Sequence, residues 1–165
     1  MDLKSIEPIV QQRVNAFYAQ YHRALEQQHL MEWVDMLDPN VSYRITSREN
    51  LQRGWPLCFV RCDNQGMAHD RACALLSSIY FRQRRQQHAL SYIHITDIRR
   101  EGGVMWVSVD TSLSVHESLN HDEARLLVTV TTHDKLRLDD QDARFTERLV
   151  ICEPDVITDS LVYPL

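Results

Sequence analysis

The sequence lacks a long uninterrupted apolar run, and no segment approaches the roughly 20 residues that a membrane-spanning helix needs. Residues Met1 to Lys4 carry mixed charges, without the positive and apolar regions of a secretory signal. Cysteine is scarce, because only four occur in 165 residues. Four scattered thiols are too few for a disulfide framework in a chain of this length. We therefore expect a cytoplasmic protein with reduced thiols and no membrane contact.

An excess of positive charge is also absent. The formal net charge is −5, which disfavours nucleic acid as a partner because a phosphate backbone requires a cationic surface. The chain also lacks internal repeats, low-complexity tracts and interdomain linkers. Its 44% hydrophobic and 25% charged residues are typical of one soluble globular domain. We expect a single domain over residues 1–165.

Helical periodicity marks three segments in the first half of the chain. Apolar side chains recur every three or four positions from Ser5 to Gln28, from Leu30 to Leu37 and from Met67 to Phe81. Residues 41–46 and 57–62 have strand composition, and a polar loop separates them. The pattern predicts three helices and two strands before residue 82.

Strand-like segments fill the second half. The sequence predicts strands at residues 88–99, 104–115, 124–138, 144–152 and 156–163, with turns at 101–103, 118–122 and 139–142. Helices followed by a run of strands indicate an α+β fold. Three successive long strands favour a strongly curved antiparallel or mixed sheet, with the N-terminal helices packed on its concave face.

The last 19 residues are unusually apolar for a chain end. Two strand-like segments, 144–152 and 156–163, carry this pattern almost to Leu165. Terminal residues are usually polar and poorly ordered, so this ending needs cover from its own sheet or from a partner.

Four residues have the chemistry of zinc ligands, namely Cys58, Cys62, His69 and Cys73. Their spacing argues against a metal site, because the first two flank one predicted strand whereas the last two lie on a predicted helix. Buried thiols are the simpler interpretation.

The sequence also contains residue types that bind iron. His121, Asp122, Glu123 and His133 could supply two imidazoles and a carboxylate, but the first three lie in a predicted turn, where such residues ordinarily face solvent. A Rieske cluster needs Cys-x-His and Cys-x-x-His pairs, and the sequence contains neither. We expect no metal ligands and no cofactor-binding residues in this chain.

A curved sheet capped by helices encloses a cone that can hold an acid–base site. The candidates are Asp35, Tyr18, Tyr43 and His88. The two tyrosines equally fit core aromatics with a polar tip, and Asp35 could face solvent. One alternative function is therefore a free-standing isomerase, dehydratase or hydrolase that uses Asp35, His88 and Tyr18. A binding or scaffold protein with an open apolar cavity is another.

A distributed set of residues identifies a family resemblance over nearly the whole chain. The set comprises Tyr43-Arg44, Arg48-Glu49-Asn50, Gly54-Trp55-Pro56-Leu57-Cys58, Met67, Asp70-Arg71, His88 and the ending from Glu147-Arg148 to Tyr163-Pro164-Leu165. The sequence resembles the small (β) subunit of bacterial aromatic-ring-hydroxylating dioxygenases. It is most similar to the substituted-benzoate branch, which includes salicylate 5-hydroxylase and the anthranilate, 2-halobenzoate and terephthalate dioxygenases. Phe145 stands where many relatives carry Trp.

The resemblance implies a cone-like fold of the nuclear-transport-factor-2-like (NTF2-like) type. It also implies a hydroxylating oxygenase of α3β3 composition, with contacts between β subunits. In that assembly the large subunit holds a Rieske [2Fe-2S] cluster and a mononuclear Fe(II). Electrons come from NADH through a reductase and, in some systems, a ferredoxin. The small subunit is structural, so no catalytic residue is implied for this chain.

Subunit contacts are expected on the exposed side of the sheet and at the strand ends. Arg82, Arg84 and Arg85 follow a predicted helix and either face solvent or meet carboxylates of a partner. Tyr163, Pro164 and Leu165 are expected at or near a subunit contact, because the sheet alone does not fully cover the apolar ending.

Overall fold

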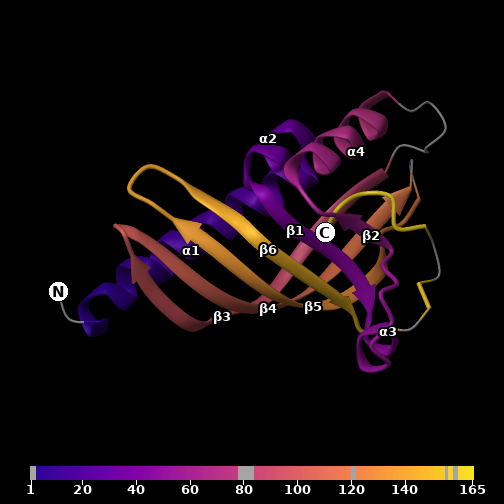
Figure 1. The fold of residues 1–165 in the computed structure, drawn as a ribbon. Helices are drawn as coiled ribbons and strands as arrows, with labels where there is room; N and C mark the ends of the chain where they lie inside the picture. The colour runs from indigo at the N-terminus through magenta and orange to yellow at the C-terminus, as the bar shows by residue number, and fades with distance from the viewer. Residues whose placement is uncertain (1–2, 78–83, 120–121, 155, 158–159) are drawn as a thin grey trace.

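The computed structural model describes residues 3–77, 84–119, 122–154, 156–157 and 160–165 (Figure 1). Its helices are α1 (Leu3–Glu26), α2 (Leu30–Asp35), α3 (Arg48–Gln52) and α4 (Gln65–Ser77). Its strands are β1 (Leu37–Ser47), β2 (Val60–Cys62), β3 (Arg84–Glu101), β4 (Val104–Leu119), β5 (Arg125–Leu138) and β6 (Ala143–Cys152).

The described strands form one sheet in the order β2-β1-β6-β5-β4-β3. Neighbouring strands are antiparallel except β1 and β6, which run parallel. The sheet is therefore mixed, and the predicted α+β class is confirmed. The β1–β6 pairing brings the first strand of the chain beside the last strand that the structure describes.

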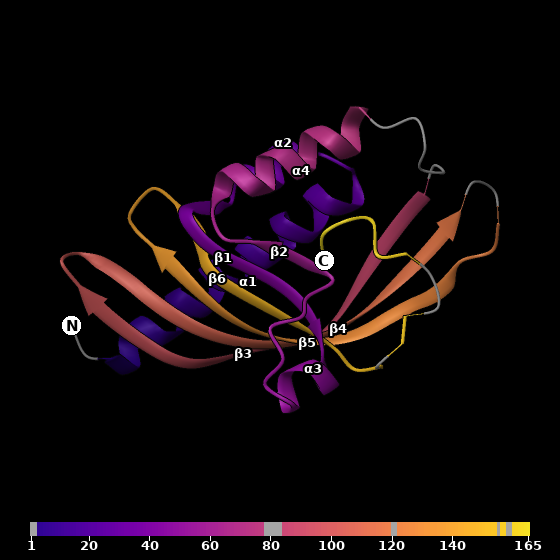
Figure 2. The ribbon, with the colours of Figure 1, turned by 45° about the vertical axis from the view of Figure 1, so that its right-hand side comes forward.

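Helix α1 crosses one face of the curved sheet, with α2 and α4 beside the β1 end (Figures 1 and 2). Its apolar stripe packs inward, since Val10, Val14, Phe17, Tyr21 and Leu25 are all buried. This is the helix face that the sequence spacing predicts. The expected cover of the concave face by N-terminal helices is confirmed.

None of the described helices is both long enough and apolar enough to cross a membrane.

The strands β3 and β4 form a long hairpin whose curvature has local causes. Gly102 and Gly103 make the turn with φ of 58° and 85°, a conformation that favours glycine. Register shifts interrupt the pairing between Leu90 and Tyr92 and between Ile95 and Asp97. Such bulges bend a strand and increase its twist. The expected strong curvature is visible in Figure 2.

Two predicted elements were wrong. The described residues of the predicted strand at 156–163 form no strand. Instead, residues 160–165 have irregular backbone, and Val162 and Leu165 are buried. Residues 48–52, predicted as part of a polar loop, form α3, because the Ser47 hydroxyl accepts a hydrogen bond from the Asn50 N–H at 3.1 Å and caps the helix.

Element boundaries also shifted. The predicted strand at 57–62 narrows to Val60–Cys62, and the helix predicted from Met67 begins at Gln65. Its predicted end at Phe81 lies outside the described residues. A core cluster runs from α1 to β6 and includes Leu165. That residues 1–165 form a single domain stays a prediction.

Candidate functional site

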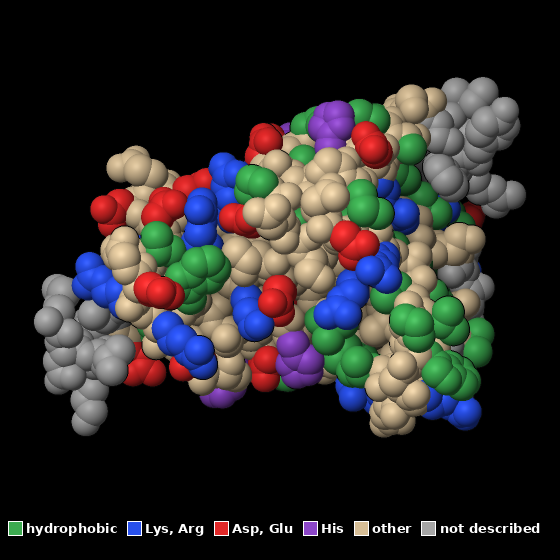
Figure 3. Space-filling view, viewed as in Figure 1, with side chains coloured by type: hydrophobic (Ala, Val, Ile, Leu, Met, Phe, Trp, Pro, Cys, Tyr) green, Lys and Arg blue, Asp and Glu red, His purple; other side chains and the backbone are tan. Residues whose placement is uncertain are grey.

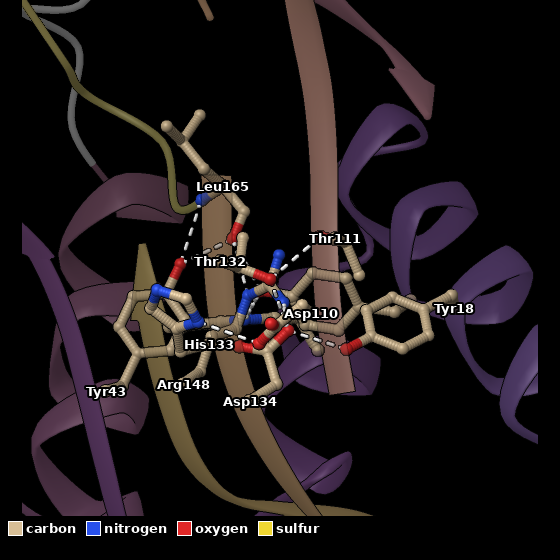
Figure 4. Close-up of polar contacts among 11 residues, drawn as sticks. Tyr18, Tyr43, Asp110, Thr111, Thr132, His133, Asp134, Arg148 and Leu165 are labelled. Carbon is tan, nitrogen blue, oxygen red and sulfur yellow. Dashed lines mark hydrogen bonds and ion pairs between the residues drawn. The ribbon is translucent and has the colours of Figure 1, made fainter. Parts of the chain in front are cut away.

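The interior of the cone contains a buried ion pair. Arg148 on β6 and Asp134 on β5 both have fully buried side chains, and Arg148 Nη1 lies 2.5 Å from Asp134 Oδ2. The same carboxylate oxygen accepts hydrogen bonds from the Tyr18 hydroxyl at 2.6 Å and the Thr132 hydroxyl at 2.7 Å (Figure 4). Four side chains from α1, β5 and β6 thus share one charged centre.

The chain's own last residue occupies the space beside this centre. The backbone oxygen of Leu165 accepts hydrogen bonds from the hydroxyls of Tyr21 and Tyr43, each at 2.8 Å, and from Arg148 Nε at 3.1 Å. Its backbone N–H donates to the Tyr43 hydroxyl at 2.9 Å (Figure 4). Tyr21 and Phe145 lie against the guanidinium, with centroids 4.7 and 4.9 Å from Arg148 Cζ. This part of the cone is filled by protein.

The tyrosine and arginine side chains inside the cone do not change protonation state near neutral pH. Burial, with the Asp134 carboxylate facing it, raises the pKa of Tyr18 well above its ordinary value. Burial likewise raises the pKa of Tyr21 and Tyr43. Burial is the largest single effect on Arg148 and opposes its charge, but the Asp134 carboxylate and the three neighbouring tyrosines together outweigh burial, and the pKa of Arg148 is raised. The tyrosines stay protonated and the arginine stays charged, so these groups hold the structure rather than exchange protons.

Two buried imidazoles stack near this centre. The rings of His22 and His88 lie 5.2 Å apart with planes inclined by 6°. Burial lowers the pKa of His22 to about 2 and that of His88 to about 4. Glu26 Oε1 is 3.6 Å from His88 Nδ1, too far for a hydrogen bond, and instead accepts one from the His88 backbone N–H at 2.8 Å. Both rings are neutral at physiological pH.

The residues of the alternative acid–base site are not brought together. Tyr18 is engaged by Asp134, and His88 stacks on His22. Asp35 is exposed at the end of α2. Tyr18 and Tyr43 are core aromatics with bonded hydroxyls, as the simpler interpretation predicts. The free-standing enzyme is therefore the less supported function.

The candidate metal ligands are dispersed. Among the residues that the structure describes, no three His, Cys, Asp or Glu side chains lie close enough to hold a metal ion. Cys62 and Cys152 are buried, and burial raises the pKa of Cys152 to about 12. Cys73 lies 3.8 Å from the His69 ring on exposed α4. His133 pairs with Asp110 at 2.7 Å on the outer face of the sheet, and His121 lies outside the described residues.

The predicted interface residues occupy contrasting positions. Arg84 is buried and pairs with Glu117 at 3.1 Å, whereas Arg85 is exposed. Arg82 lies outside the described residues. Tyr163 is half-buried, and Pro164 and Leu165 are buried within this chain. Their role in a subunit contact stays a prediction.

An exposed apolar surface that the sequence pattern did not predict lies on α3 and on the segment between α3 and β2. Leu51, Trp55, Leu57 and Phe59 are 45%, 46%, 58% and 43% exposed. We refer to these four residues as the apolar patch. Figure 3 shows hydrophobic side chains gathered over α3 and the segment that follows it. The signal was present, because four large apolar residues within nine positions are unusual in a loop.

No protein-family model matches the sequence. The beta 1 subunit of the terminal oxygenase component of terephthalate 1,2-dioxygenase from a Comamonas species is 24% identical over 153 residues, covering 93% of this chain and 97% of that protein. The small subunit of anthranilate 1,2-dioxygenase from Burkholderia cepacia is 22% identical over 141 residues, covering 86% and 85%.

Solved structures agree on the fold. A chain assigned as the beta subunit of an aromatic-ring-hydroxylating dioxygenase from Novosphingobium aromaticivorans aligns with a TM-score of 0.84 at 25% identity, covering 97% of this chain and 99% of that chain. A chain assigned as a scytalone dehydratase from the same organism aligns with a TM-score of 0.72 at 10% identity, covering 99% and 97%, and shows the fold alone. These comparisons confirm the predicted resemblance to ring-hydroxylating dioxygenase small subunits and the nuclear-transport-factor-2-like cone.

Proposed function

We propose that this chain is the non-catalytic small subunit of a Rieske-type oxygenase that hydroxylates a substituted benzoate, of the salicylate, anthranilate or halobenzoate class. Relatives named as small or beta subunits of terephthalate and anthranilate dioxygenases support this over nearly the whole chain. The structure adds one observation that carries the structural role. Leu165 and the Arg148–Asp134 ion pair are buried in the cone, so this part of its interior is filled by the chain itself.

The cofactors of such an oxygenase are assigned to its large subunit. This chain's residues do not fit a Rieske cluster, because the sequence has neither the Cys-x-His nor the Cys-x-x-His pair. In the proposed assembly the large subunit carries the [2Fe-2S] cluster and the mononuclear iron, and NADH supplies electrons through a reductase. The small subunit contributes a rigid body on which large subunits are positioned, with a proposed α3β3 stoichiometry.

Co-purification tests the proposal. The chain is co-expressed with the large subunit of its own oxygenase, recognised by Rieske spacing in a neighbouring reading frame, and the mass of the purified material is measured by light scattering. We expect equal copies of the two chains in one particle, with the mass of a hexamer. A chain that remains free of the large subunit at micromolar concentrations would overturn the proposal.

A further inference from the structure

The apolar patch projects from the body of the molecule on a well-supported segment. Figures 1 and 2 show α3 at the margin of the sheet, away from the helices that cover its concave face. The Trp55 N–H donates to the Asn50 carbonyl at 2.9 Å, and the Phe59 N–H donates to the Ile45 carbonyl at 2.7 Å. The Thr46 hydroxyl donates to the Leu57 carbonyl at 2.7 Å. Because its backbone is tied to β1, the segment holds its apolar side chains outward without further ordering.

The size of the patch points to a binding surface. Four large side chains, each about half exposed, present on the order of 400 Å² of apolar area, which is comparable to the largest patch on a typical monomer. The Arg53 guanidinium lies over the Trp55 ring at 4.7 Å and holds that ring in place. Pre-ordered aromatic and aliphatic side chains are the usual centres of protein interfaces.

Three arginines at the margin of the patch are each paired with a carboxylate of this chain. Arg48 pairs with Glu153 at 2.6 Å, Arg53 with Glu49 at 2.8 Å, and Arg61 with Asp63 at 2.8 Å. A partner that covers the patch would therefore bury no isolated charge at its margin. A neutral margin around an apolar centre fits a lasting association better than one driven by opposite net charges.

A second copy of this chain fits the patch poorly. Two patches face to face would bury on the order of 800 Å² in total, below the roughly 1,200 Å² of a specific interface. The copies would also each carry a net charge of −5. A different chain can form a larger interface that continues from the patch onto the outer face of the sheet. Arg44 lies two residues before Thr46 on β1, so both side chains are on the same face of the sheet. On that face Arg44, Ser42 and His133 line a polar hollow.

We propose that the apolar patch is the docking surface for the oxygenase large subunit, an inference that rests on the proposed function. Leu51, Trp55, Leu57 and Phe59 form the apolar centre of that interface. The outer face of the sheet around Arg44 forms its polar continuation.

The test compares Leu57→Asp with a matched control. Leu126 on β5 is exposed to a similar extent, 53% against 58% for Leu57, so Leu126→Asp places the same charge outside the patch. Each variant is titrated against the immobilised large subunit, and thermal unfolding checks that it is folded. We expect Leu57→Asp to weaken binding at least tenfold, Leu126→Asp to stay within twofold of the unmodified chain, and Leu57→Met to bind normally.

Each outcome bears on a distinct claim. A folded Leu57→Asp variant that binds like the unmodified chain overturns the patch assignment and leaves the proposed function standing. Failure of the unmodified chain to bind overturns the proposed function itself. Self-association of the chain alone that Leu57→Asp abolishes assigns the patch to a second copy and also overturns the inference. If Leu57→Asp does not fold, Leu51→Asp on exposed α3 carries the same test.

Discussion

At the scale of single residues, the buried Arg148–Asp134 pair is the position where a small change should cost most. Asp134→Ala leaves the guanidinium of Arg148 buried without its carboxylate and frees the hydroxyls of Tyr18 and Thr132. We expect the free energy of unfolding to fall by about 3–5 kcal/mol, measured by urea denaturation.

The exposed pair on the same two strands provides the control. Lys135 and Glu147 lie 3.0 Å apart with half-exposed side chains, so Glu147→Ala should cost under about 1 kcal/mol. Replacing Arg148 and Asp134 together with Met and Leu should restore part of the loss, because no unpaired charge remains. Equal costs for Asp134→Ala and Glu147→Ala would contradict the central role of the buried pair.

The stacked histidines predict how stability depends on pH. Their folded pKa values, about 2 for His22 and about 4 for His88, lie below the ordinary value of about 6.5. The unfolded chain therefore takes up protons first as the pH falls, and stability is lost below pH ~6.5. With both rings contributing, the slope should be steepest near pH ~5, at about 2.5 kcal/mol per pH unit.

A single variant separates this effect from the general acid response of carboxylates. His88→Phe keeps an aromatic ring against His22 and removes one titrating group, so it should halve the histidine contribution to the slope. Urea denaturation at several pH values between 4 and 8 provides the measurement. An unchanged slope in His88→Phe would show that the rings are solvated when folded.

At the scale of elements, the C-terminal segment acts as a filler of the cone rather than as a strand. Deleting residues 163–165 removes the acceptor for Tyr21, Tyr43 and Arg148 and leaves three buried donors unpaired. An unpaired buried group costs about 1–3 kcal/mol, so the deletion should lower the free energy of unfolding by at least about 3 kcal/mol. Denaturation of the deleted chain measures this.

The same deletion tests the expected subunit contact. The deletion is compared with Asp134→Ala under conditions where the two variants are equally stable. If the segment also touches a partner, the deletion should weaken assembly with the large subunit more than Asp134→Ala does. Val156→Ser, at a position 76% exposed in the same region, should change neither stability nor assembly. A stable, fully assembling deletion variant would show that the segment serves neither purpose.

Hydrophobic periodicity predicted most helices and strands, because the buried face of each one follows from the spacing of apolar residues within that segment. The spacing of Val10, Val14 and Phe17 identified the buried face of α1, and alternation identified the long strands. It failed for residues 156–157 and 160–163, which form no strand although their composition is apolar. It also failed for α3, where one hydroxyl cap outweighs a polar composition.

The set of buried polar contacts around the Asp134 carboxylate was not predicted, for a different reason. Arg148 is paired with Asp134, 14 residues away, while Tyr18 reaches the same carboxylate across 116 residues. The Arg148–Asp134 pairing follows from the register of the β5–β6 hairpin, in which these two residues are direct partners, whereas the Tyr18 contact depends on the path of α1, which no spacing in the sequence encodes. The family resemblance predicted the fold, but not what fills the cone.

At the scale of the whole molecule, the paired charges around the apolar patch predict how assembly responds to salt. Arg48, Arg53 and Arg61 each have a carboxylate partner in this chain, so these three side chains leave little attraction at the margin of the patch for salt to screen. Between about 0.05 and 0.5 M NaCl, the dissociation constant for the large subunit should change less than about threefold. Titration at each salt concentration measures it.

Removing the carboxylate partners of two of these arginines should make assembly dependent on salt. Glu49→Gln and Asp63→Asn together free Arg53 and Arg61 without altering the patch itself, so the doubly substituted chain gains two uncompensated positive charges beside the interface. Its association should become salt-dependent, tighter or weaker at low salt according to the sign of the facing surface. Steep salt dependence in the unmodified chain would instead mean that opposite charges, rather than the apolar patch, hold the two subunits together.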